Sequence, residues 1–118
     1  MTGVSRKTRA EVRERDRDTC QMPDCGRPIR DDDYSLQHRR ARGMGGSRRP
    51  DTNAPSNLVT VCGSATTGCH GYIESHPGIA AKLGFRVAQG VTPADVPIYT
   101  FTHGRVYLND DGTHTKER

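Results

Sequence analysis

Four cysteines in two pairs constrain the fold of this chain more than any other feature. Cys20 and Cys25 have four residues between them. Cys62 and Cys69 have six residues between them, and glycines accompany both pairs, as in tight turns. Two such turns brought together would give a tetrahedral site of four thiolates, which favours zinc and leaves no position open for water. The pattern predicts a structural Zn²⁺ site, with buried free thiols or two disulfides as the alternatives.

The composition indicates that burial of apolar surface alone does not stabilise the fold. The chain has 118 residues, of which 31% are hydrophobic and 5% aromatic, and it has no Trp. A single domain of this size hides only about two-thirds of its unfolded surface, so a large apolar core is excluded. A structural zinc site contributes on the order of 10 kcal/mol to folding, which favours metal over free thiols.

No segment of the sequence is typical of a membrane or secreted protein. No apolar run approaches the roughly 18 residues that a membrane-spanning helix needs. The N-terminus is charged throughout and lacks the apolar stretch of a signal peptide. We therefore expect a cytoplasmic protein with no membrane partner. In a reducing cytosol, four cysteines favour metal over disulfides.

The charge of the chain favours nucleic acid as its partner. The formal net charge is +4, and 15 of the 18 basic residues are Arg. Arg presents a planar fork that can bind phosphate through two hydrogen bonds. Composition alone does not decide the matter, because many basic proteins bind no nucleic acid.

The chain is expected to form one domain, 1–118, of the small α+β class. Residues 5–18 are dense in charge without Gly or Pro and predict an exposed helix. The β-branched run 58–61 predicts a strand, preceded by another over 34–38. The expected parts are an N-terminal helix (1–19), a zinc-stapled core (20–76), a segment with a short helix and a hairpin (77–110), and a frayed polar tail (111–118). Helices are expected over 68–75 and 77–83, and the hairpin over 97–101 and 105–108. His103 and His114 are expected to have no role in the chemistry.

The order of three polar residues carries a family resemblance. His38 ends the first predicted strand, Asn57 precedes the second, and His70 follows Cys69 at the start of a helix. This strand, loop, strand and helix order, interleaved with the cysteines, resembles the HNH endonuclease family, and most of all its small free-standing bacteriophage members. The resemblance implies a zinc-stabilised, treble-clef-like ββα-metal unit, here with an N-terminal helix and a C-terminal β-hairpin.

The resemblance implies a role for each of the three residues. His38 matches the general base that takes a proton from the attacking water, and a neutral imidazole suits that role at cellular pH. Asn57 matches the residue that orients the base or its loop and, in some members, ligates the metal. His70 matches a ligand of a catalytic divalent ion, Mg²⁺ or Mn²⁺, acting as a Lewis acid at the phosphate. Products with 5′-phosphate and 3′-hydroxyl ends are expected.

One position departs from the family pattern. Family members usually have Asp or His as a second metal ligand just before the base, where this chain has Gln37. A neutral amide oxygen binds a hard cation more weakly than a carboxylate does. Glu74 lies one helical turn after His70 and is the best candidate to complete the site, followed by His76.

A basic loop follows the proposed base. Residues 39–49 contain five Arg and no acidic residue, and their glycines let the backbone approach a partner closely. Such a loop would grip the phosphates around the scissile bond, giving strong salt dependence and little sequence preference. The expected DNA-binding residues are Arg39, Arg40, Arg42, Arg48 and Arg49.

These expectations combine into one reading with two alternatives. The chain is expected to be a metal-dependent HNH endonuclease that nicks or cleaves double-stranded DNA. If it is encoded by a phage, the resemblance implies a role in genome packaging with the large terminase subunit, in the cytoplasm of the bacterial host. The first alternative is a zinc-stabilised DNA-binding module that has lost nuclease activity. The second is a packaging or assembly accessory whose Arg loop binds protein.

Overall fold

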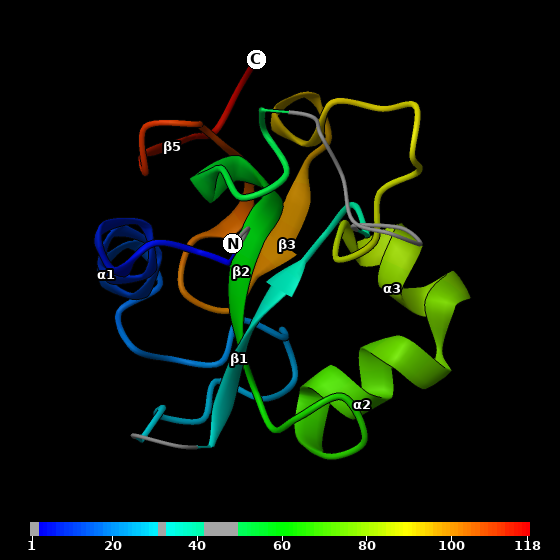
Figure 1. Cartoon of the computed structure of the whole chain (residues 1–118). Helices are drawn as coiled ribbons and strands as arrows, with labels where there is room; N and C mark the ends of the chain where they lie inside the picture. Colours follow the sequence, from blue (N-terminus) through cyan, green and yellow to red (C-terminus); the bar gives the residue numbers. More distant parts are fainter. Residues whose placement is uncertain (1–2, 31–32, 42–49) are drawn as a thin grey trace.

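The fold is a small α+β arrangement of three α-helices and two antiparallel sheets within the described residues (Figure 1). It is seen in a computed structural model that describes residues 3–30, 33–41 and 50–118. In chain order the elements are α1 (Arg6–Arg15), β1 (Tyr34–His38), the 3₁₀ turn η1 (Pro55–Asn57), β2 (Leu58–Cys62), α2 (Gly68–Ser75), α3 (Pro77–Leu83), the 3₁₀ turn η2 (Pro93–Asp95), β3 (Ile98–Thr100), β4 (Gly104–Leu108) and β5 (His114–Thr115).

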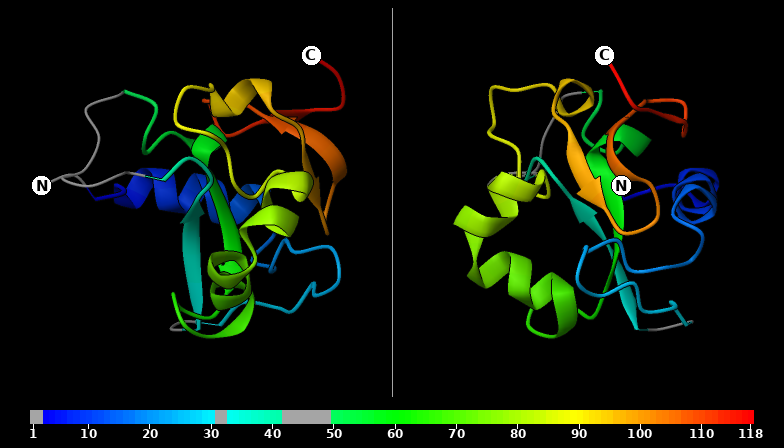
Figure 2. Two further views of the ribbon diagram at one scale, coloured as in Figure 1. Left: turned by 90° about the vertical axis from the view of Figure 1, so that its right-hand side faces the viewer. Right: turned by 180° about the vertical axis from the view of Figure 1, so that it is seen from behind.

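A two-stranded hairpin forms the centre of the molecule. Strands β1 and β2 pair antiparallel with His38 opposite Leu58, which brings the end of β1 beside the start of β2. Helix α1 lies on one side of this hairpin, and α2 and α3 lie on the other (Figures 1 and 2). The helix bounds predicted for α2 and α3 are confirmed, and Gly84 caps α3 in the left-handed conformation, with φ of 86°.

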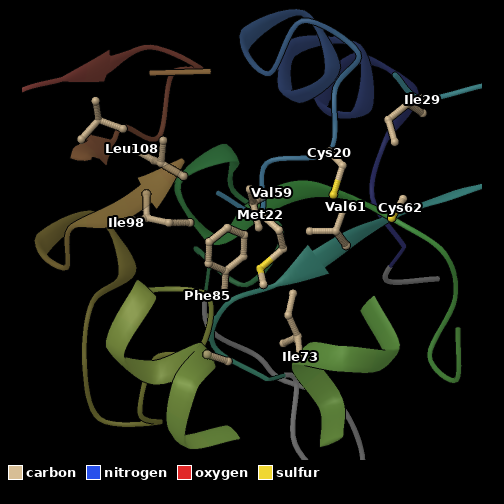
Figure 3. Packing of buried hydrophobic residues seen from close by; sticks show 12 residues of the cluster. Cys20, Met22, Ile29, Val59, Val61, Cys62, Ile73, Phe85, Ile98 and Leu108 are labelled. Atoms are coloured by element: carbon tan, nitrogen blue, oxygen red, sulfur yellow. The ribbon is translucent and has the colours of Figure 1, made fainter. Parts of the chain in front are cut away.

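One cluster of apolar side chains joins the two sheets to the helices. Ile73 of α2 and Phe85, just after α3, are completely buried. They pack with the buried faces of β2, β3 and β4 (Figure 3). Cys20 and Cys62 lie at one side of this cluster, next to Val61 (Figure 3). The cysteine site therefore closes one end of a small core.

The N-terminal helix is more deeply anchored than its charge suggests. It ends at Arg15, because Arg17 and Asp18 take positive φ angles of 56° and 48° that no α-helix accommodates. Arg15 is buried and donates to the carbonyls of Pro55 and Leu58 at 2.8 and 2.6 Å. The prediction of a fully exposed helix is therefore wrong at its C-terminal end.

The C-terminal residues are ordered, in contrast to the frayed tail expected from their polarity. The hairpin of β3 and β4 is confirmed, and β5 extends it by pairing with β4. The rings of His103 and His114 stack with their centroids 3.8 Å apart. Nε2 of His103 also donates to the carbonyl of Arg15 at 2.7 Å. These two histidines therefore make structural contacts, which their sequence positions did not indicate.

Candidate functional site

The four cysteines meet in space, as their spacing predicts. Their sulfur atoms all lie within 4.8 Å of one another, and those of Cys25 and Cys62 are 4.0 Å apart. All four are free cysteines. Four sulfurs that each lie 2.3 Å from a central zinc are roughly 3.8 Å apart. The cluster is therefore a metal-binding site in its geometry and donor set, consistent with structural zinc.

Electrostatics in the cluster also fit a cation. Burial raises the pKa of Cys20 to about 12, and burial together with the charge of Cys20 raises the pKa of Cys69 further. Burial acts in the same direction on Cys62, but hydrogen bonds from the Cys69 backbone N–H and the neighbouring thiols outweigh it and lower the pKa of Cys62. The thiolate form is thus favoured at Cys62 relative to Cys20 and Cys69, whereas a bound Zn²⁺ would stabilise four thiolates.

A second polar cluster lies where the hairpin meets α2. His38 ends β1, and His70 is the third residue of α2, which packs against both strands. Burial lowers the pKa of His70, the Glu74 carboxylate acts against this, and nearby His38 adds to it. Glu74 Oε2 lies 4.0 Å from Nε2 of His70 and 4.0 Å from a nitrogen of Arg86.

One nitrogen of His70 is buried without a hydrogen-bond partner. Among the described residues, Nδ1 of His70 and the hydroxyl of Thr60 are the buried side-chain polar atoms in this state. An unpaired buried polar atom costs about 1–3 kcal/mol, so its presence needs an explanation. A neutral imidazole nitrogen is a common metal ligand. The Glu74 carboxylate lies near the other ring nitrogen, Nε2, so Glu74 and the unpaired Nδ1 do not face one position.

Asn57 is placed as a clamp on the backbone. It is completely buried, and its Oδ1 accepts from the N–H of Arg40 at 2.7 Å. Its Nδ2 donates to the carbonyls of Arg40 and Thr52, at 3.1 and 2.8 Å. The side chain therefore fixes the segment after β1 against the segment before η1. This arrangement fits the loop-orienting role implied for Asn57, and its amide is engaged by the backbone rather than directed to a metal.

The remaining predicted ligands are placed less favourably. Gln37 is 4% exposed, and its Nε2 donates to the main-chain carbonyl of His38 at 3.1 Å. His76 is exposed at the end of α2, where its ring stacks on Tyr72 at 4.0 Å between centroids. Among the described residues, the four cysteines are the one group of three or more His, Cys, Asp or Glu side chains whose ligand atoms gather closely enough to hold a metal, so His38, His70 and Glu74 do not form a preassembled metal site. His76 is engaged with its own helix.

The expectation for the first two residues of the Arg loop is corrected. Arg39 is 1% exposed and Arg40 is 2% exposed. The guanidinium of Arg39 donates to main-chain carbonyls only, and that of Arg40 pairs with Asp51 and donates to the carbonyl of Val91. Neither guanidinium is available to a DNA phosphate. Arg42, Arg48 and Arg49 lie outside the described residues.

Sequence reasoning missed one residue that contacts the proposed base. Nε2 of His38 lies 2.8 Å from Oδ1 of Asn53. Asn is common in loops, so nothing in its local sequence distinguishes Asn53 from a turn residue. The contact depends on how the residues just before η1 lie against the end of β1.

Comparisons with known proteins find no relative of this chain. No protein-family model matches the chain, and neither a curated protein nor a solved structure is significantly similar to it. The helices in the described part of the chain are too short and too polar to cross a membrane. The class that the fold and site define is a small α+β protein whose four clustered cysteines could bind a metal.

Proposed function

We propose that this chain is a metal-dependent endonuclease of the HNH type that hydrolyses phosphodiester bonds in double-stranded DNA. The observation that carries the proposal is Nδ1 of His70, which is buried without a hydrogen-bond partner on α2, the helix that packs against the strand ending at His38. The order β1, β2, α2 with the cysteine cluster beside it supports a treble-clef-like ββα-metal unit. In that unit the four cysteines hold a structural zinc.

The residues of the site divide the chemistry between them. His38 takes the proton of the attacking water, a contribution of about 10²- to 10⁴-fold to the rate. His70 and Glu74 would hold a divalent ion, with Gln37 as a weaker third ligand. Mg²⁺ or Mn²⁺ bound there would act as a Lewis acid at the phosphate. Because Mg²⁺ usually keeps several waters and shares phosphate oxygens, two or three protein ligands suffice.

The DNA is held through its phosphates. With Arg39 and Arg40 committed to the interior, this role falls to Arg42, Arg48 and Arg49 of the same loop. Phosphate contacts carry no sequence information, so cleavage has low specificity and weakens as salt rises. If the chain is encoded by a phage, packaging of its genome with the large terminase subunit is the setting in which such a nuclease acts.

Replacing the proposed metal ligand is expected to raise the metal requirement. Loss of even an outer-shell partner costs about 10- to 100-fold in metal affinity, so His70→Ala should need at least about tenfold more Mn²⁺ for half-maximal plasmid nicking. His114→Ala, on β5, is the matched control and should leave the metal titration unchanged. Zinc content and circular dichroism establish that both variants are folded.

The other outcomes separate the competing functions. Salt-sensitive DNA binding without nicking by the unaltered protein would favour the DNA-binding module, with the neutral Gln37 as the reason for lost catalysis. Absence of DNA binding would favour the assembly accessory. An unchanged metal titration in His70→Ala would remove His70 from the metal site.

A further inference from the structure

We propose that Asn53 is the positioning residue that holds the imidazole of His38 in the tautomer needed for base catalysis. The proposal rests on the function proposed above. It assigns to Asn53 a contact with the base that the family resemblance does not give it. Asn53 does not touch the reacting atoms, so it acts through His38.

The hydrogen bond between the two side chains determines which imidazole nitrogen carries the proton. Oδ1 of Asn53 lies 2.8 Å from Nε2 of His38. An amide oxygen can only accept a hydrogen bond, so Nε2 must carry the proton. In a neutral imidazole the other nitrogen, Nδ1, then holds the lone pair. Nδ1 is therefore the atom of His38 that takes the proton from water.

Two further contacts hold the segment that carries Asn53. The carbonyl of Thr52, the preceding residue, accepts from Nδ2 of Asn57 at 2.8 Å. The carboxylate of Asp51 accepts hydrogen bonds from both terminal nitrogens of the buried Arg40 guanidinium. Because Arg40 lies two residues after His38, both contacts tie the Asn53 segment to the end of β1. The position of Asn53 against the base is therefore preorganised.

These contacts divide the orienting role between two asparagines. Asn57 bonds only to backbone groups of Arg40 and Thr52 and so positions the loop. Asn53, which follows Thr52 in the segment before η1, contacts His38 itself. A change at Asn57 should therefore disturb the fold around the site, whereas a change at Asn53 should remove a contact with the imidazole of His38.

The test combines a spectroscopic signal with activity. In ¹⁵N-labelled protein at about pH 8, the ring proton on Nε2 of His38 should be protected from exchange and visible by NMR. Asn53→Ala should lose this signal and nick plasmid DNA about 10- to 100-fold more slowly, since small misplacements of catalytic groups cost that much. Asn53→Asp keeps the acceptor oxygen and should restore both. Asn109→Ala, at an asparagine beside β5, is the matched control for both readouts.

Each contrary result has a distinct meaning. A ring proton on Nδ1, or an Nε2 signal that survives in Asn53→Ala, would overturn the hydrogen bond. Loss of the signal with nicking unchanged would overturn the positioning role. Absence of nicking by the unaltered protein would overturn the proposed function. That last failure is recognisable because the response of the ring proton to Asn53→Ala is measured without DNA.

Discussion

Chelation of the zinc proposed at the four-cysteine site is expected to unfold this protein. The sulfurs lie within 4.8 Å of one another, and burial raises the pKa of Cys20 to about 12. A structural zinc contributes on the order of 10 kcal/mol, which is comparable to the whole stability of a small domain, about 5–15 kcal/mol. With only 31% hydrophobic residues, the core cannot replace that contribution. A strong chelator should abolish the circular dichroism of the fold, and added Zn²⁺ should restore it.

Two further measurements make this expectation specific. Native mass spectrometry should give one zinc per chain on fully reduced cysteines. Cys62→Ser should bind zinc weakly and unfold at far lower urea, whereas Met22→Leu, a volume-conserving change in the adjacent core, should retain the metal. A chain that keeps its cooperative unfolding after chelation would show that the thiols are packing residues, and a mass corresponding to oxidised cysteines would favour disulfides.

The second large effect is expected at Arg39. Its guanidinium donates to four main-chain carbonyls, those of Gly84 (2.7 Å), Ser56 (2.9 Å), Pro93 (3.1 Å) and Val96 (2.8 Å). Burial, with a smaller effect of Arg15, lowers the pKa of Arg39 to about 9, so the side chain is still charged at neutral pH. Arg39→Met would leave these carbonyls without a donor.

The expected loss for Arg39→Met is about 1–3 kcal/mol for each buried carbonyl left without a donor. The measurement is the midpoint of urea unfolding of the zinc-loaded protein. Arg39→Lys should recover only part of the loss, because an ammonium cannot reach carbonyls in four directions as the planar fork does. Arg105→Met, on the exposed face of β4, should leave the midpoint unchanged. An unaltered midpoint in Arg39→Met would show that the carbonyls find other donors.

The elements around the site could be predicted because local signals determine them. β-branched residues 58–61 form β2, and Gly84 ends α3 with a positive φ of 86°. The meeting of the four cysteines followed from their chemistry, since pairs on two turns gain stability only by sharing a cation. These features depend on residues that are close in sequence or on one strong ligand preference.

The parts that could not be predicted depend on distant backbone. A loop arginine is usually exposed, and Arg39 is buried because carbonyls 17 to 57 positions away converge on it. The tail pairs with β4 although its own residues have little strand propensity. Asn53 reaches His38 across 15 residues of chain, through clamps made by Arg40 and Asn57. No local pattern reports such contacts.

The most direct test of the central claim is nicking of supercoiled plasmid with Mg²⁺ or Mn²⁺ by the intact protein and by His38→Ala. The variant must first be shown to be folded with its zinc. The expected result is metal-dependent nicking that falls by about 10²- to 10⁴-fold in the variant, while plasmid binding is retained. Nicking that survives unchanged in His38→Ala, or no nicking by the intact protein, would contradict the assignment of this site as a nuclease with His38 as its base.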